Sequence, residues 1–194
     1  MTAGLILAAG ESRRMGSPKA LLLYQGETFL DRLIGLFLQR CSPVIAVLGA
    51  HHDRVRAGMR RAAQAVLVEN PDFRRGQLSS MQCGLRAVPP NAEGVLFTLV
   101  DHPAVQPETV AALLAPAAPG PLRIPQSGGR RGHPIWFSMP LVEEFLALPG
   151  ASTAREVITR HAAEIAYIPV DDPGILADVD DPEAYATLLA GRHS

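Results

Sequence analysis

The chain has 194 residues, of which 47% are hydrophobic and 19% charged, and its formal net charge is −1. This length suits one sizeable hydrophobic core, so we expect a single domain over residues 1–194. A net charge this close to zero argues against nucleic acid as a partner and against an anionic membrane surface. The sequence also lacks a bilayer-length apolar run and a signal-peptide pattern, so we expect a cytoplasmic protein without membrane contact.

The first predicted element is a short buried strand that leads into a basic loop. Residues 4–7 are apolar, and the small residues Ala8, Ala9 and Gly10 then allow the backbone to approach a bulky ligand closely. The loop over residues 10–19 combines arginines and a lysine with backbone N–H groups. Fixed dipoles and cations at close range bind polyphosphate, so the loop predicts a phosphate site.

Lys19 is the only lysine among the 18 Lys and Arg residues of the chain. A compact ammonium group contacts a phosphoryl oxygen as a point charge, which a planar guanidinium cannot reproduce without moving the contact. We therefore predict a specific phosphate contact for Lys19. Two better-known phosphate loops are excluded, because two residues separate Gly16 from Lys19 and because the loop lacks the third glycine of a dinucleotide fingerprint.

Strands and helices alternate through the middle of the chain. The expected elements are a helix capped by Thr28 and ending near Arg40, a strand at 44–48, a helix at 53–63, a strand at 65–68, a helix at 77–87, a strand at 94–100 and a helix at 107–114. This alternation predicts an α/β fold with three layers, in which helices cover both faces of a Rossmann-like, mostly parallel sheet.

The second half of the chain is expected to complete this sheet. Its expected elements are antiparallel strands at 122–125 and 134–137 around a basic turn, helices at 140–146 and 152–160, a strand at 163–170, a helix at 182–189 and a frayed tail at 191–194. Cys41 and Cys83 are too few and too far apart for a disulfide framework or a zinc site.

The most apolar strand, residues 94–100, ends at Asp101. Ligands of α/β sheets bind at the carboxyl ends of the strands, so we expect Asp101 beside the loop that starts at Gly10. A buried carboxylate is costly unless it meets a cation, and Mg²⁺ beside phosphates is held by one or two carboxylates. A helix-capping role is the plainer alternative for Asp101, and the neighbouring phosphate loop weighs against it.

Residues 7–22 match a known signature, Leu-Ala-Ala-Gly-x-Ser-x-Arg-Met-Gly-x-Pro-Lys-x-Leu-Leu, at every fixed position. The sequence thus resembles the MobA-like nucleotidyltransferases, and Ala9 is similar to the cytidylyltransferase branch, since the guanylyltransferase branch has glycine there. The resemblance implies a nucleotide-diphospho-sugar transferase-like fold. It also implies Mg²⁺-dependent transfer of CMP from CTP to the phosphate of molybdopterin carrying molybdenum, the molybdenum cofactor, with release of pyrophosphate. The product would serve a molybdoenzyme.

Later motifs extend the resemblance over nearly the whole chain: residues 76–81, 101–103, 132–134 and 178–182. The resemblance implies catalytic roles for Arg14, Lys19 and Asp101. It implies nucleotide contacts for Leu7, Ala8, Ala9, Gly10, Lys19, Ser79 and Ser80. It implies metal ligation by Asp101 and Asp180, and acceptor binding by Arg131 and His133.

Several alternatives stay open at this point. Ser79 and Ser80 could instead cap a helix, and Arg131 could lie on a solvated turn. Asp181 stands where the family has threonine, so any of Asp178, Asp180 and Asp181 could face the metal. The rival functions are a nucleotidyltransferase of the same family that uses GTP or a sugar phosphate, and a non-catalytic chaperone that carries the cofactor to a molybdoenzyme.

Overall fold

A central sheet organises the computed structural model, which describes residues 1–191, so the frayed tail expected at 191–194 lies outside the described part except for its first residue. Within that part, eight strands form one sheet in the order β10-β7-β9-β6-β1-β4-β5, with β8 paired to β7. Its strands are β1 (Thr2–Ala8), β4 (Val44–Leu48), β5 (Val66–Glu69), β6 (Gly94–Leu99), β7 (Leu122–Ser127), β8 (Arg130–Arg131), β9 (Ile135–Ser138) and β10 (Ile165–Pro169). A separate hairpin joins β2 (Leu23–Tyr24) to β3 (Glu27–Thr28).

Most of the strand pairs in this sheet are parallel. β1 lies in parallel between β4 and β6, β5 continues from β4, and β10 pairs in parallel with β7. β9 is antiparallel to both β6 and β7, as the sequence predicted for residues 122–125 and 134–137. The prediction of a mostly parallel sheet is therefore confirmed.

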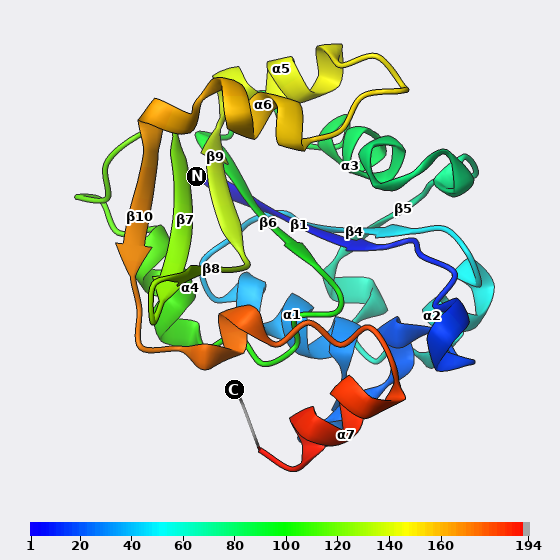
Figure 1. Ribbon diagram of the computed structural model, residues 1–194. Helices are drawn as coiled ribbons and strands as arrows, with labels where there is room; N and C mark the ends of the chain where they lie inside the picture. Colours follow the sequence, from blue (N-terminus) through cyan, green and yellow to red (C-terminus); the bar gives the residue numbers. More distant parts are fainter. Residues whose placement is uncertain (192–194) are drawn as a thin grey trace.

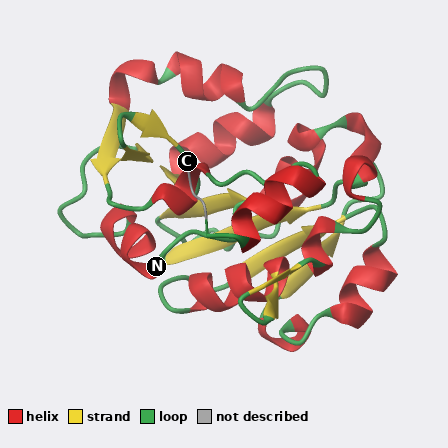
Figure 2. Ribbon diagram, turned by 60° about the horizontal axis from the view of Figure 1, so that its bottom comes forward, coloured by secondary structure: helices red, strands yellow, loops and turns green. Residues whose placement is uncertain are grey.

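Helices cover both faces of the sheet (Figures 1 and 2). The helices are α1 (Phe29–Leu38), α2 (His52–Gly58), α3 (Gln77–Leu85), α4 (Pro107–Leu113), α5 (Met139–Ala147), α6 (Arg155–Arg160) and α7 (Pro182–Leu189). In Figure 1, α3, α5 and α6 lie above the sheet, and α1, α2, α4 and α7 lie below it. None of the helices within residues 1–191 has the length and apolar character needed to cross a bilayer.

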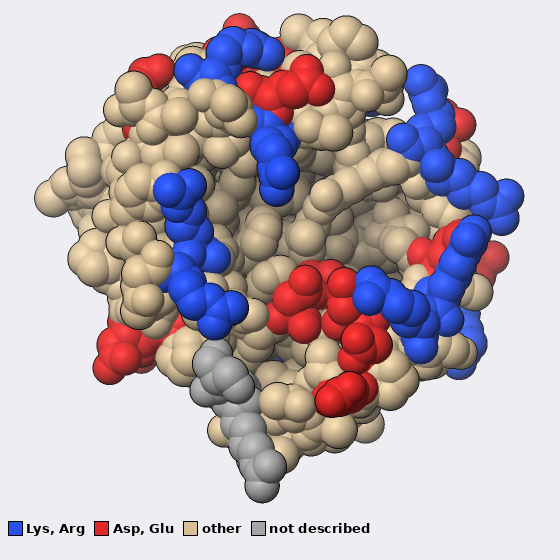
Figure 3. Space-filling model, in the orientation of Figure 1, with Lys and Arg blue, Asp and Glu red and all other residues tan. Residues whose placement is uncertain are grey.

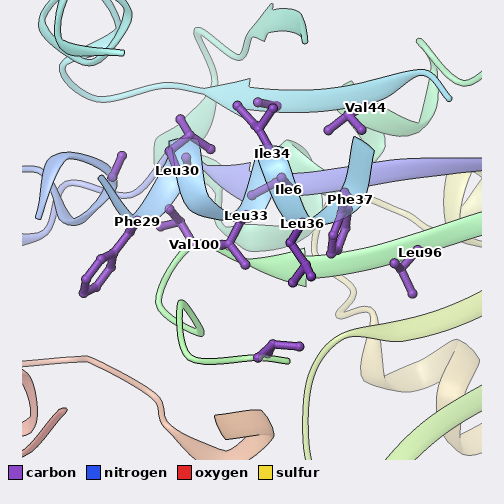
Figure 4. Close-up of a cluster of buried hydrophobic side chains, with 14 of the residues drawn as sticks. Ile6, Phe29, Leu30, Leu33, Ile34, Leu36, Phe37, Val44, Leu96 and Val100 are labelled. Carbon is purple, nitrogen blue, oxygen red and sulfur yellow. The ribbon is translucent and has the colours of Figure 1, made fainter. Parts of the chain in front are cut away.

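The core lies on both sides of the sheet, because successive side chains of a strand point to opposite faces. In β1, Ile6 joins the cluster between the sheet and α1, whereas Leu5 and Leu7 join the cluster between the sheet and the helices α3 and α5. Figure 4 shows the first cluster, in which Leu33 and Phe37 of α1 pack against the sheet and are fully buried. Burial on both faces explains why β1 and β6 read as continuous apolar runs.

The predicted α1 is confirmed, including its cap, while α2 is shorter than predicted. Thr28 accepts a hydrogen bond from the Asp31 N–H at 3.1 Å, as an N-cap residue does. The buried Asp31 carboxylate also accepts the N–H groups of Arg60 at 3.1 Å and Arg61 at 2.8 Å. These N–H groups cannot then bond within a helix, so α2 ends at Gly58 and the helix predicted to residue 63 was too long.

A buried carboxylate anchors the loop that precedes α7. Asp172 is 3% exposed and accepts hydrogen bonds from the Thr109 hydroxyl at 2.6 Å, the Gln106 N–H at 2.9 Å and the Gly174 N–H at 2.8 Å. A Cβ atom at Gly174 would lie only 2.3 Å from the Ala104 carbonyl oxygen, so only glycine allows this approach. The loop is thereby held against the segment between β6 and α4.

We predict that Asp172→Asn destabilises the protein by about 2 kcal/mol, because hydrogen bonds to a charged acceptor contribute about 1.5–3 kcal/mol and the amide replaces an acceptor with a donor. Thermal unfolding should show this as a drop in Tm of about 4–8 °C for a chain of this size. Asp171→Asn is the matched control, since the neighbouring Asp171 is exposed. Equal melting temperatures for the two variants would contradict the anchoring role.

His161 joins two helices of the upper layer through carboxylates on both sides of its ring. Its Nδ1 lies 2.7 Å from Glu164 and its Nε2 lies 2.7 Å from Glu144 of α5. Arg160, the last residue of α6, also contacts Glu144, at 2.7 Å. The hydrogen bond to Glu164, with that to Glu144, raises the pKa of His161 above its ordinary value.

A raised pKa means that the charged imidazole stabilises the fold below pH 6.5 and that this contribution is lost as pH rises through the folded-state pKa. We therefore expect His161→Gln to lower Tm more at pH 5.5 than at pH 8.5. Pairs at the surface contribute at most about 1 kcal/mol, so the difference should be about 2–4 °C. A Tm loss that is the same at both pH values would count against the charged pair.

Candidate active site

A cleft of about 350 Å³ opens where the neighbouring strands β1 and β6 end. Its walls come from the loop after β1, the residues after β6, the start of α3 and the segment before α7. Figure 3 shows acidic and basic side chains gathered next to each other beside a hollow on this face. Because β1 and β6 are parallel, the loop and Asp101 meet at one sheet edge, as the sequence predicted.

The loop after β1 is folded so that Lys19 points into this cleft. Ser12 has a left-handed backbone (φ 51°), and a 3₁₀ turn over Arg13–Met15 follows it. The Ser12 hydroxyl accepts the N–H of Lys19 at 3.0 Å, which closes the loop. The Lys19 side chain is 13% exposed, whereas that of Arg14 is 65% exposed.

The charged side chains of the cleft form a continuous row. The Lys19 Nζ lies 2.5 Å from Oδ1 of Asp180 and 3.5 Å from Oδ2 of Asp101. The other Asp180 oxygen, Oδ2, accepts a hydrogen bond from Nη2 of Arg14 at 2.7 Å. The structure thus brings Arg14, Lys19, Asp101 and Asp180 together, although they are spread over 167 positions of sequence (14 to 180).

A second group at the same place has the composition of a cation site. Asp101, His102 and Asp178 each offer one ligand atom, and these atoms lie within 4.8 Å of one another. His102 is 7% exposed, and its Nδ1 lies 2.9 Å from Oδ1 of Asp101. Carboxylate and imidazole ligands suit divalent cations, so these residues could hold one.

The protonation equilibria of the three aspartates differ because their neighbours differ. Burial acts to raise the pKa of Asp101, but the hydrogen bond and charge of His102, together with Lys19, bring it below its ordinary value. Lys19 and Arg14 lower the pKa of Asp180. Burial, followed by the charges of Asp101 and Asp180, raises the pKa of Asp178. This last carboxylate lies in a negative field that a bound cation would relieve.

The other residues predicted for the nucleotide are divided by the structure. Leu7, Ala8, Ala9, Gly10 and Ser80 line the cleft. The hydroxyl of Ser79 donates instead to the carbonyls of Asp72 and Gly76, and Ser79 lines a separate depression. Its role at the nucleotide stays a prediction.

The two residues predicted for the acceptor lie apart from the cleft lining. Arg131 is exposed and its guanidinium lies 4.5 Å from the centroid of the Tyr167 ring. The His133 ring lies behind His102, with 4.8 Å between the ring centroids, and its buried Nδ1 has no hydrogen-bond partner among the described residues. Burial lowers the pKa of His133 to about 4, so its ring is neutral at pH 7. Acceptor binding by these residues stays a prediction.

Sequence reasoning missed some residues at the rim of the cleft. Phe73 lines it, and the guanidinium of Arg74 lies 5.4 Å from the centroid of the Phe73 ring. The Glu11 carboxylate lies 2.5 Å from Nε of Arg13 and 3.3 Å from Nε of Arg74. It therefore links the phosphate loop to the turn before α3. Motif spacing carries no signal for such contacts, because they depend on two loops meeting in space.

Comparison with known proteins places the chain in a family. The model of the MobA-like NTP transferase domain matches residues 4–165. Molybdenum cofactor cytidylyltransferase of Escherichia coli is 27% identical over 94% of this chain and 93% of the relative. Nicotine blue oxidoreductase of Paenarthrobacter nicotinovorans is 31% identical over 96% and 95%, and molybdenum cofactor guanylyltransferase of Sinorhizobium fredii is 30% identical over 86% and 78%.

Solved structures share the fold over nearly the whole chain. A homologue of Mycobacterium tuberculosis Rv0371c from Mycobacterium sp. strain JC1 superposes with a TM-score of 0.82 at 28% identity, covering 98% of this chain and 96% of the other. Rv0371c in complex with manganese gives a TM-score of 0.79 at 28% identity, covering 97% and 98%. The family match, the cationic loop and the sheet topology agree: the chain belongs to the MobA-like NTP transferase family and is a nucleotidyltransferase with the nucleotide-diphospho-sugar transferase fold.

Proposed function

We propose that this chain transfers CMP from CTP to the phosphate of molybdopterin that carries molybdenum, as a single domain over residues 1–194. The observation that carries the proposal is the position of Lys19 in the cleft, between the carboxylates that end β6 and precede α7. A relative named molybdenum cofactor cytidylyltransferase matches the chain almost end to end, which supports this acceptor and this nucleotide. Ala9, which lines the cleft, resembles the residue of the cytidylyltransferase branch at this position.

In this reaction an oxygen of the acceptor phosphate attacks the α-phosphorus of the nucleotide, and the bond to pyrophosphate breaks. Lys19 and Arg14 balance the negative charge that grows on the transferred group and on the pyrophosphate. The small side chains of Ala8 to Gly10 let the triphosphate lie against the backbone of the loop. The chain therefore works mainly by alignment and charge neutralisation, without a covalent intermediate.

The charged residues of the cleft fit a divalent cation, which we propose to be Mg²⁺. Asp101 and Asp178 would hold it, with His102 beside them, since their ligand atoms lie within 4.8 Å of one another. Asp180, the second ligand predicted from the sequence, pairs with Lys19 instead, and its ligation of the metal stays a prediction. A cation there would neutralise charge on the phosphate oxygens of the nucleotide. A relative at 28% identity has been solved in complex with manganese, which supports the use of a divalent ion by this chain.

Substitution of Lys19 tests the catalytic role. We expect Lys19→Ala to lower the rate of pyrophosphate release by at least about 100-fold, the usual cost of removing one group that stabilises a transition state. Lys19→Arg should recover little of this loss, because a guanidinium does not reproduce a point contact. Arg54→Ala, at an exposed site on α2, is the control.

Pyrophosphate release measured with CTP or GTP and molybdopterin separates the rival functions. A non-catalytic chaperone, or an oxidoreductase like the relative of that name, would bind without releasing pyrophosphate. Release by the Lys19→Ala variant at the wild-type rate would refute the role of Lys19. Circular dichroism and Tm should confirm that both Lys19 variants are folded.

Nucleotide preference is tested by thermal shift with Mg²⁺ present. We expect CTP to raise Tm more than GTP at equal concentration, because a ligand stabilises the folded state according to the logarithm of its concentration over Kd. A ten-fold difference in Kd corresponds to about 1.4 kcal/mol, or about 3–6 °C for a chain of this size. A larger shift with GTP would assign the chain to guanylyl transfer instead.

A further inference from the structure

Asp180 forms ion pairs with Lys19 and Arg14, the two cations that the proposed function assigns to the triphosphate. Its Oδ1 lies 2.5 Å from Lys19 Nζ and its Oδ2 lies 2.7 Å from Arg14 Nη2. A carboxylate and a phosphate present oxygens to cations in the same way. Asp180 thus imitates one edge of a phosphate group in the place where the phosphates are expected.

A triphosphate can replace Asp180 in these ion pairs without disrupting the fold. The side chain of Asp180 is 41% exposed and that of Arg14 is 65% exposed. The Arg14–Asp180 pair, which is this accessible to water, contributes little to stability, whereas the Lys19–Asp180 pair is open to water mainly on the Asp180 side, because the Lys19 side chain is 13% exposed. A triphosphate, with several negative charges, can therefore compete with one carboxylate for Lys19 and Arg14.

The backbone on either side of Asp180 is fixed, so such an exchange requires movement of the side chain alone. The N–H of Val179 donates to the carbonyl of Asp101 at 3.0 Å. On the other side, the Asp181 carboxylate accepts the N–H of Ala184 at 2.9 Å and caps α7. A displaced Asp180 carboxylate consequently stays at the cleft, next to the incoming phosphates.

We propose that Asp180 is an internal substitute for the triphosphate that makes nucleotide binding depend on the divalent cation. This inference rests on the proposed function. Without a cation, the displaced Asp180 carboxylate repels the phosphates that took its partners. Asp101 and Asp178 lie at the same place, so a cation held there attracts both the phosphates and the displaced carboxylate.

The inference predicts opposite effects of one substitution in two conditions. Without a divalent cation, Asp180→Asn should bind the triphosphate more tightly than the wild type, because Lys19 and Arg14 are free of a charged competitor and the repulsion is gone. With the cation, the same variant should bind more weakly, because a carboxylate near the cation is lost. A residue that merely orients Lys19 would instead weaken binding in both conditions.

Isothermal titration calorimetry of the full chain with CTP, GTP and inorganic triphosphate tests this, once with EDTA and once with excess Mg²⁺. In EDTA we expect Asp180→Asn to bind about ten-fold tighter than the wild type, the effect of one charge-assisted hydrogen bond. In Mg²⁺ we expect it to bind about ten-fold weaker, because the carboxylate near the cation is lost. Glu183→Gln is the matched control, since Glu183 is an exposed acid on α7, and its affinity should stay within about two-fold of the wild type.

Asp180→Ala should show the same reversal as Asp180→Asn, and Tm measurements should confirm that both variants fold. Failure of both variants to bind more tightly than the wild type in EDTA would overturn the substitute role and leave the proposed function standing. If the wild type binds none of the three probes with Mg²⁺ present, the proposed function fails as well. Inorganic triphosphate makes these outcomes independent of the choice of base.

Discussion

The ammonium group of Lys19 is the contact on which the rest of the site depends. It lies between the carboxylates of Asp101, near the middle of the sequence, and Asp180, near its end. Its side chain is only 13% exposed, so these charges attract more strongly than they would in open water. Without the ammonium group, Asp101, Asp178 and Asp180 would repel one another at the sheet edge. Lys19 therefore stabilises the acidic group that a divalent cation would bind.

This arrangement follows from the way three segments reach one sheet edge. Parallel pairing of β1 and β6 places the phosphate loop and Asp101 together. The third segment comes from beyond β10 and carries Asp178 and Asp180. It reaches the cleft because the buried Asp172 is bound at the start of α4 and because the Val179 N–H bonds to the Asp101 carbonyl. Anchors with no part in the chemistry thus decide where the chemical groups lie.

The sequence predicts the parts of this site that depend on one continuous segment. An apolar run predicts a strand, and the end of the run marks the carboxyl end of that strand. This prediction agrees with the structure for β1, which leads into the phosphate loop, and for β6, which ends just before Asp101. Other features depend on contacts between distant segments. The short α2 follows from Asp31 binding the N–H groups of Arg60 and Arg61. Period-two alternation puts Asp178 and Asp180 on one side of their segment, but it does not show that Asp180 pairs with Lys19 and Arg14.

The cleft is divided between charged residues and an uncharged wall, and this division explains why relatives with different names share one fold. In the proposed reaction the cations and carboxylates would bind the triphosphate, which all nucleoside triphosphates share. We propose that the base is selected by the uncharged wall of the cleft, where Ala9, Phe73 and Ser80 lie. The Ser80 hydroxyl accepts a hydrogen bond from the buried Asn70 amide at 3.0 Å, which fixes its orientation. One methyl group or one hydrogen bond on this wall changes binding by about 1–3 kcal/mol. A change of this size alters the preferred base while the contacts to the phosphates stay the same.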